Sequence, residues 1–257
     1  MSNKPSHFIW YELMTSDVDA AAKFYGAVAG WTVQTAAQPG MDYRMWQSAG
    51  EGVGGLLAID ADAKAGGMQP AWLPYVDVAD VDESVAAIKA AGGASHMAAD
   101  IPGVGRIAMV TDPQGAAFYV MKPIGEGQST VFAPGRLGHR GWNELHAKDG
   151  SSAWDFYRAR LGWDEAGTFD MGPMGTYRTF SAGGAEAIGG MMPSPGFDRP
   201  MWLSYVNVDD IDAAKSRVES AGGEVTTGPH EVPTGEWMIQ ARDPQGALFG
   251  LLGPKKA

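Results

Sequence analysis

Glu144 and His146 stand two residues apart and could together move a proton. On an extended strand, residues i and i+2 point to the same face, so the carboxylate and the imidazole would share one face. A carboxylate in that position orients an imidazole and raises its pKa, which suits a general base. The pair is therefore a candidate catalytic site. A structural or exposed His146 is the plainer alternative, and the pair could instead join His139 around an adventitious metal ion.

The same strand pattern occurs earlier in the chain, where Glu12 stands in the segment Trp10-Tyr-Glu-Leu13. Parity places the tryptophan and the glutamate of each segment on one inner face. A carboxylate on an otherwise apolar strand is costly unless it is paired or lies in an open cavity. The simplest structural partner for Glu12 or Glu144 is Arg44 or Arg178, respectively.

An internal repeat sets the architecture. The pattern Trp-x-Glu-Leu, Asp, Phe-Tyr, Gly-Trp begins at Trp10 and returns at Trp142, with an offset of 132 residues at each position. Later matches, including Asp112-Pro-Gln-Gly115 against Asp243-Pro-Gln-Gly246, keep offsets of 130 and 131. A fixed period over so much of the chain indicates two copies of one unit.

Each copy divides again into two βαβββ modules, which predicts an α+β fold. Capping residues, glycine stops and residue periodicity set the elements of the first copy. We expect strands at 8–15, 31–35, 43–48, 54–59, 72–78, 94–98, 106–111 and 116–121, and helices at 18–28 and 81–91. The predicted domains are 1–122 and 139–257, with two modules each. The Gly-, Pro- and Ser/Thr-containing segment 123–138 is the predicted linker.

Composition excludes several classes of function. The formal net charge of −11 at pH 7 is unfavourable for binding a nucleic-acid backbone, and no basic amphipathic stretch suggests a membrane surface. The chain has no cysteine, which removes disulfides, thiolate nucleophiles and Cys-based zinc sites. We expect a cytoplasmic protein with neither a nucleic-acid nor a membrane partner; a homodimer is possible.

The chain resembles the vicinal oxygen chelate superfamily of glyoxalases, bleomycin-resistance proteins and extradiol dioxygenases. The resemblance rests on the first strand followed by Asp17 and Phe24-Tyr25, and on Asp-Pro-Gln-Gly before a hydrophobic strand. The Trp-x-Glu-Leu start is similar to the double-length branch of the superfamily. It implies two tandem domains whose mixed sheets curl into cups for small organic ligands.

The resemblance also locates the positions at which metalloenzymes of the superfamily hold their ion. In this chain those positions hold residues other than His, Gln or Glu, namely Trp10, Leu73, Tyr119, Trp142, Leu203 and Gly250. Hard divalent cations take imidazole nitrogen or carboxylate oxygen. We therefore expect no metal and no other cofactor.

Strand parity and the repeat nominate the residues that would line the two cups. They are Trp10, Glu12, Tyr75, Tyr119, Trp142, Tyr205, Asn207, Arg44 and Arg178. Three functions compete: binding of a small organic ligand in a metal-free aromatic cup, a metal-independent lyase or isomerase that uses Glu144 and His146, and a metal-dependent glyoxalase or dioxygenase with displaced ligands.

The two copies differ at two paired positions, which predicts that the C-terminal cup is the working one. Gly250 stands where the first copy has Tyr119, so the second cup should be larger unless a neighbour fills the space. His146 stands where the first copy has Met14, and only the histidine can transfer a proton. Ordinary drift between repeats, with neither cup functional, is the alternative.

Overall fold

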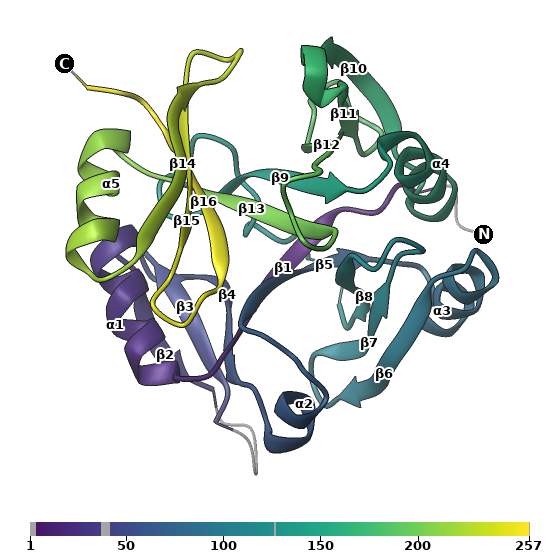
Figure 1. Cartoon of the computed structure of the whole chain (residues 1–257). Coiled ribbons are helices and arrows are strands. Elements are labelled where there is room, and N and C mark those ends of the chain that lie inside the picture. The colour runs from purple at the N-terminus through teal and green to yellow at the C-terminus, as the bar shows by residue number, and fades with distance from the viewer. Residues whose placement is uncertain (1–3, 37–41, 126, 257) are drawn as a thin grey trace. The chain divides into compact units, whose positions relative to one another are not determined.

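The computed structural model describes residues 4–36, 42–125 and 127–256 (Figure 1). Each half of the chain contributes one eight-stranded mixed sheet. The first sheet has the order β2-β3-β4-β1-β5-β8-β7-β6 and the second the order β10-β11-β12-β9-β13-β16-β15-β14. Because the two orders correspond strand for strand, the predicted α+β fold of four βαβββ modules is confirmed.

The strands of the first half alternate with three helices. The strands are β1 (Phe8–Thr15), β2 (Thr32–Thr35), β3 (Arg44–Ser48), β4 (Glu51–Ala58), β5 (Ala71–Asp77), β6 (Ala94–Ile101), β7 (Gly105–Thr111) and β8 (Ala117–Pro123). The helices are α1 (Val18–Ala29), α2 (Ala61–Ala65) and α3 (Val81–Ala90). The short helix α2 was not predicted; it begins where the Asp60 side chain accepts a hydrogen bond from the Ala63 N–H.

The second half repeats this order with two α-helices and one 3-10 turn. Its strands are β9 (Arg140–Ala147), β10 (Asp164–Asp170), β11 (Thr176–Ser181), β12 (Gly189–Pro193), β13 (Met201–Asn207), β14 (Glu224–Glu231), β15 (Trp237–Arg242) and β16 (Leu248–Gly253). Its helices are α4 (Gly150–Leu161), η1 (Gly172–Met174) and α5 (Ile211–Ser220).

Helix boundaries follow the capping residues of the repeat. The Asp17 side chain accepts hydrogen bonds from two N–H groups in the first turn of α1, and Asp149 does the same for Ser152 at α4. Each helix then ends on a left-handed glycine, Gly30 with φ 70° and Gly162 with φ 69°. That conformation is open to glycine at little cost, so both helices end at equivalent positions.

The chain forms two compact units, and each contains one module from each half. The first comprises 1–9, 74–129 and 143–203, and the second comprises 10–73, 130–142 and 204–257. Within the first unit α3 packs beside α4, and within the second α1 packs beside α5 (Figure 1). The family resemblance and the strand pattern did not predict this pairing of modules.

An aspartate–tyrosine–tryptophan network joins the two modules inside each unit. In the second unit Trp72 Nε1 donates to the Tyr25 hydroxyl (2.8 Å), which donates to Asp243 Oδ2 (3.1 Å). Asp243 also accepts from two N–H groups of its own Asp-Pro-Gln-Gly turn. Burial raises the pKa of Asp243 and that of Tyr25. The turn motif therefore fixes a module contact as well as a reversal of the chain.

The first unit contains the same network from the other pair of modules. Trp202 Nε1 donates to the Tyr157 hydroxyl (3.0 Å), and Tyr157 donates to Asp112 Oδ2 (3.1 Å). Asp112 Oδ1 accepts from Gln114 N and Ala116 N, each at 2.8 Å. Both networks are buried, so each supplies partners for polar groups that would otherwise destabilise the core.

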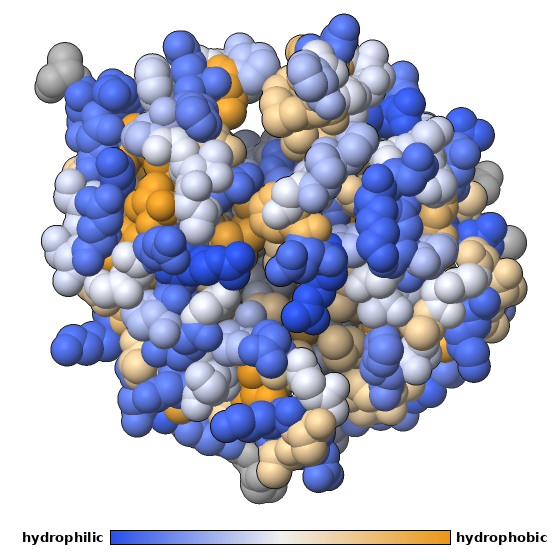
Figure 2. Space-filling view, in the orientation of Figure 1, coloured by the Kyte–Doolittle hydropathy of each residue, from blue (hydrophilic) through white to orange (hydrophobic). Residues whose placement is uncertain are grey.

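Hydrophilic side chains predominate on the face of the molecule drawn in Figure 2, and hydrophobic residues appear there as separate patches. Among the described residues, no helix is long and apolar enough to cross a membrane.

Candidate functional site

Two parallel strands of the third module position the candidate pair. In the register between β9 and β12, Glu144 lies opposite Gly190, and His146 lies opposite Met192. Both side chains are buried, with 10% of the Glu144 side chain and 4% of the His146 side chain exposed. The predicted sharing of one strand face is borne out by a contact, because His146 Nε2 lies 2.9 Å from Glu144 Oε1.

Tyr177 on β11 completes the surroundings of the carboxylate. Its hydroxyl donates to Glu144 Oε2 at 3.0 Å. The phenol ring reaches the carboxylate by crossing Gly190, where any Cβ would overlap the ring. A glycine within a strand often marks such a close approach of a neighbouring group.

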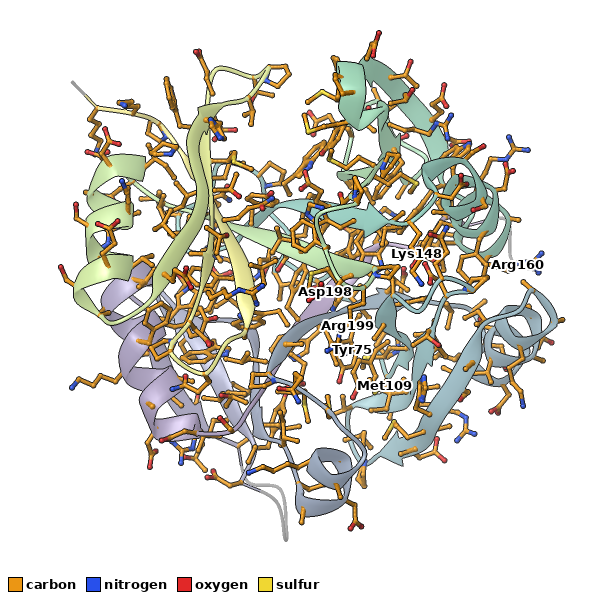
Figure 3. All side chains as sticks on the ribbon, in the orientation of Figure 1. Tyr75, Met109, Lys148, Arg160, Asp198 and Arg199 are labelled. Atoms are coloured by element: carbon orange, nitrogen blue, oxygen red, sulfur yellow. The ribbon has the colours of Figure 1, made fainter. Side chains whose placement is uncertain are left out.

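The other nitrogen of His146 is also engaged. Its Nδ1 lies 2.7 Å from the Ser194 hydroxyl oxygen, just beyond the end of β12. The Phe197 ring lies on the imidazole, with centroids 4.3 Å apart and an angle of 35° between the planes. Figure 3 shows the next two residues, Asp198 and Arg199, on the same segment. His146 thus has a hydrogen bond at Nδ1, a carboxylate close to Nε2 without hydrogen-bond geometry, and an aromatic ring on one face.

The first module has a simpler version of this cluster. Tyr43 donates its hydroxyl hydrogen to Glu12 Oε2 at 3.2 Å and accepts from Trp10 Nε1 at 3.1 Å. Burial and the Glu12 carboxylate raise the pKa of Tyr43 far above its usual value, so the phenol stays a donor. Gly55 again provides the space, since a Cβ there would overlap Glu12 and Tyr43. Met14 occupies the place of His146 and cannot transfer a proton.

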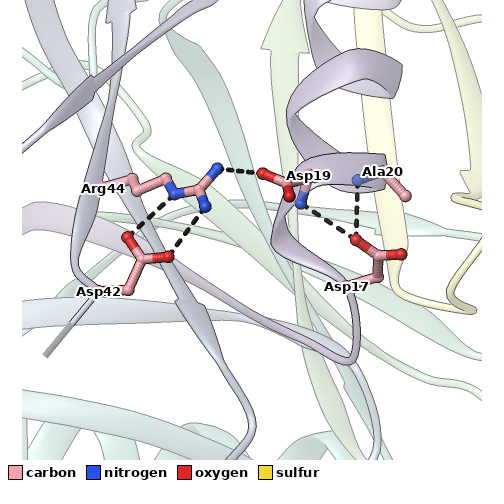
Figure 4. A network of polar contacts seen from close by, with 5 residues as sticks. All are labelled: Asp17, Asp19, Ala20, Asp42 and Arg44. Atoms are coloured by element: carbon pink, nitrogen blue, oxygen red, sulfur yellow. Dashed lines mark hydrogen bonds and ion pairs between the residues drawn. The ribbon is translucent and has the colours of Figure 1, made fainter.

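The predicted ion pairs of Glu12 with Arg44 and of Glu144 with Arg178 are wrong. Arg44 instead pairs with Asp19 at 2.6 Å and with Asp42 at 2.9 Å (Figure 4). Tyrosine and arginine are adjacent on the strand, so they point to opposite faces. Once Tyr43 faces the glutamate, Arg44 must face the other way.

Arg178 follows the same rule in the third module. Its Nε lies 2.7 Å from Glu165 Oε2, and its guanidinium lies over the Trp154 ring, 5.3 Å from the centroid. These contacts lie beside a surface cavity of about 430 Å³ whose lining includes Trp154 and Glu165 but none of the Glu144 cluster. Arg178 therefore belongs to the packing of α4 against β10 rather than to the candidate site.

The prediction of extra space at Gly250 is also wrong. In the second unit the Tyr205 ring fills the space over Gly250, where a Cβ would overlap it. Gln240 Nε2 fixes this ring by donating to the Tyr205 hydroxyl at 2.8 Å. In the first unit the equivalent tyrosines, Tyr75 and Tyr119, stack on each other with centroids 4.1 Å apart. The glycine admits the neighbouring Tyr205 ring into the space that a side chain would occupy.

Of the remaining candidate cup residues, Asn207 has a structural role, and the roles of Trp10 and Trp142 are not determined by their contacts. Asn207 is buried, and its Nδ2 donates to the carbonyl oxygens of Ala133 and Arg136 at 2.9 Å and 3.0 Å. It therefore anchors the segment that precedes β9. Trp142 and Trp10 are partly exposed on equivalent strands, and their roles in ligand binding stay predictions.

The six positions that hold metal in the superfamily carry two tryptophans, two leucines, a tyrosine and a glycine. This donor set does not fit a divalent cation. Across residues 4–36, 42–125 and 127–256, no three His, Cys, Asp or Glu side chains group as a metal-binding cluster. His139, which was considered as a third ligand, directs its Nδ1 to the Thr130 carbonyl oxygen at 2.7 Å.

Sequence reasoning missed Tyr177 and Ser194 as members of the cluster. The recurrence of Tyr43-Arg44 as Tyr177-Arg178 was a usable signal, because strand parity assigns the tyrosine and the arginine to opposite faces. Ser194 gave no signal, since its contact with His146 depends on the parallel register between β9 and β12.

Solved structures share this fold at low sequence identity. The Mn(II)-bound glyoxalase from Novosphingobium aromaticivorans superposes with a TM-score of 0.66 and 17% identity, covering 98% of this chain and 83% of that chain. The 2,3-dioxygenase LapB from Pseudomonas sp. KL28 gives 0.64 and 14%, covering 99% and 94%. At these identities the likeness concerns the fold alone.

Curated relatives match nearly end to end. The putative glyoxylase CFP32 of Mycobacterium tuberculosis is 36% identical over 251 residues, which are 95% of this chain and 94% of the relative. The anthracycline biosynthesis protein DnrV of Streptomyces peucetius is 32% identical over 259 residues, covering 95% and 91%. The family model matches twice, at residues 7–120 and 137–251, and the chain therefore belongs to the Glyoxalase/Bleomycin resistance protein/Dioxygenase superfamily.

Proposed function

We propose that the protein binds a small organic ligand without a metal ion, and that Glu144 is its polar anchor. One observation carries the proposal: a buried carboxylate accepts a hydrogen bond from Tyr177 at 3.0 Å and lies 2.9 Å from His146 Nε2. Binding sites for small molecules typically combine an apolar lining with a few well-placed polar groups. Glu144, Tyr177 and His146 form such a group.

The donor set at the superfamily's metal positions supports a metal-free site. Side chains such as Leu73 and Leu203 have no donor atom that could ligate a metal ion. Any acid–base chemistry must then come from the protein's own side chains, and Glu144 and His146 are a buried acid and base that lie side by side.

The chemical class of the ligand follows from the mixture of side chains. Tyr177 and His146 can each form a hydrogen bond, while Phe197 offers an aromatic face beside the imidazole. A hydroxylated aromatic compound matches both features. The name of the 32% identical relative, an anthracycline biosynthesis protein, agrees with this class.

A second candidate function is a metal-independent lyase or isomerase. The arrangement that favours it is His146 set between a carboxylate and a hydroxyl, at 2.9 Å from Glu144 and 2.7 Å from Ser194. A carboxylate that orients an imidazole makes the ring a general base, and such bases accelerate proton transfer by about 10²–10⁴-fold. The same residues thus serve either binding or catalysis.

The test compares matched variants of the two halves. Binding of alizarin, a hydroxylated anthraquinone, is measured by calorimetry for the native protein, Glu144→Gln and Glu12→Gln. We expect Glu144→Gln to weaken binding by about tenfold or more, equivalent to about 1.4 kcal/mol, and Glu12→Gln to leave it unchanged. A larger loss for Glu12→Gln would overturn the assignment to the second half.

Elemental analysis of the same purified protein tests the metal-free state. We expect well under one equivalent of Zn, Mn, Fe or Ni per chain. Close to one equivalent per domain, lost in Glu144→Gln, would contradict the proposal and favour a metalloenzyme with displaced ligands.

A further inference from the structure

Ser194 stands in a tight turn that directly follows β12. Its backbone N–H donates to the Ala147 carbonyl oxygen at 2.9 Å, and its own carbonyl accepts from Phe197 N at 3.1 Å. Two prolines, Pro193 and Pro195, flank it and fix φ on both sides. The serine is therefore held in place by the backbone and is not carried on a free loop.

Three side chains form a continuous polar line from the core to this turn. Glu144 Oε1 lies 2.9 Å from His146 Nε2, and His146 Nδ1 lies 2.7 Å from Ser194 Oγ. A neutral imidazole carries one hydrogen, so one nitrogen donates and the other accepts. His146 Nε2 lies beside Glu144 Oε1 without the geometry of a hydrogen bond, and the negative charge of a carboxylate favours the hydrogen on that nitrogen. Ser194 Oγ–H then donates to the Nδ1 lone pair, and His146 is placed to remove that proton.

Accessibility increases along the line toward the serine. Glu144 and His146 are buried, whereas Ser194 is partly exposed and can meet a substrate. The turn also supplies a hydrogen-bond donor, since the Gly196 N–H has no partner among the residues the structure describes. A Cβ at Gly196 would meet no atom within 4 Å. This exposed N–H can donate a hydrogen bond to a substrate oxygen.

The equivalent strand pair of the first module lacks the histidine and the serine. Ile59 takes the place of Ser194, because its N–H donates to Thr15 O just as Ser194 N donates to Ala147 O. Met14 takes the place of His146. The first half keeps Glu12 but has neither the base nor the hydroxyl, and the second half has both.

We propose that Ser194 is a nucleophile activated by His146, with Glu144 orienting the imidazole, and that it acts on carboxylic esters or lactones. Ser194 Oγ forms a bond to the carbonyl carbon while its proton passes to His146 Nδ1. The C–O bond to the leaving alcohol breaks as the alkoxide takes that proton. Water, deprotonated by His146, then releases the acid and restores Ser194. This inference rests on the proposed binding site at Glu144.

A fluorophosphonate probe tests the nucleophile on the intact chain. Such reagents phosphonylate activated serines, and peptide mass spectrometry identifies the modified residue. We expect one adduct, on Ser194, that is absent in Ser194→Ala and forms at least about 100-fold more slowly in His146→Ala. The exposed Ser151 provides a comparison within the same protein, and its labelling should not depend on His146.

Two results would overturn the inference: no adduct on Ser194 in the native protein, or an adduct that forms equally fast in His146→Ala. Thermal unfolding of each variant establishes that it is folded, and Glu144→Gln provides a second, isosteric disruption. Hydrolysis of p-nitrophenyl acetate should decrease in parallel with labelling.

If alizarin binding depends on Glu144 while Ser194 stays unlabelled, the nucleophile is refuted and the binding site stands. If Ser194 is labelled while Glu144→Gln binds alizarin normally, the binding role of Glu144 is refuted and the nucleophile stands.

Discussion

Arg140 carries a buried positive charge, and replacing it tests how the second unit is stabilised. Only 1% of the residue is exposed. Its guanidinium carbon lies 5.0 Å, 4.9 Å and 4.3 Å from the ring centroids of Tyr11, Trp31 and Trp72. Its Nε donates to Ser204 Oγ at 3.0 Å, and its NH1 has no hydrogen-bond partner within residues 4–36, 42–125 and 127–256. Burial lowers the pKa of Arg140 to about 10.

The other unit shows an apolar solution to the same packing problem. Phe8 stands 132 residues before Arg140 in the repeat. Its ring lies 5.5 Å from both Trp163 and Trp202, the counterparts of the tryptophans around Arg140. The substitution Arg140→Phe therefore introduces a residue that this fold already accommodates.

Two opposing free energies decide the outcome. A desolvated cation–π contact contributes about 2 kcal/mol or more, whereas the desolvation of a buried ion costs several kcal/mol. Replacing buried ionic groups by packed apolar residues often stabilises a protein by about 1–4 kcal/mol. We expect a gain in this range for Arg140→Phe combined with Ser204→Ala, which removes the hydroxyl that would lose its partner.

Calorimetric unfolding measures this gain directly. Each kcal/mol corresponds to about 2–4 °C in Tm for a chain of this size. Below about pH 9 both folded and unfolded Arg140 are protonated, so the gain should not vary with pH. As pH rises through the folded pKa of about 10, the unfolded native chain binds more protons than the folded one. The free energy of unfolding of the native protein then increases, and the difference in this free energy between the double variant and the native protein becomes smaller. A double variant that melts below the native protein at pH 7 would refute the reasoning.

Two further substitutions test the contacts that define the fold. Tyr157→Phe removes the hydroxyl that donates to buried Asp112 and should cost about 1–3 kcal/mol at neutral pH by urea unfolding. Because burial raises the pKa of Asp112, folded Asp112 binds protons more readily than unfolded Asp112, and this cost should shrink as pH falls; a constant cost would show that Asp112 is not involved. Gly250→Ala drives a methyl group into the Tyr205 ring and should destabilise by about 1–3 kcal/mol, and an unchanged Tm would show that the ring can move aside.

Local signals made most of the fold predictable from sequence. The first strand, at residues 8–15, begins and ends where the alternation of side chains placed it, and helix 81–91 differs from the structure by one residue. Both depend on neighbours in the chain, such as a capping Asp80 at the start of the helix. The repeat then extended these assignments to the second half.

Contacts between distant segments were not predictable in the same way. The grouping of modules into units depends on side chains such as Phe24, whose ring meets Phe249 with centroids 5.7 Å apart. Neither residue carries a pattern that names its partner, because apolar surfaces pack without direction. The Glu144–His146 pair was predictable because both residues share one strand, whereas Ser194 lies in the turn that follows a different strand.

Some buried contacts are identical in the two halves, and others differ. The aspartate–tyrosine–tryptophan networks have the same atoms and nearly the same distances in both units. The tyrosine–glutamate bond is likewise present in both halves. In the second half, His146 and Ser194 replace the Met14 and Ile59 of the first half. His146 and Ser194 are in contact with each other. A buried imidazole is unfavourable without hydrogen-bond partners, so a histidine at this position requires a residue such as Ser194. The contact between His146 and Ser194, whose counterparts in the first half are apolar, favours the second half as the one that performs chemistry.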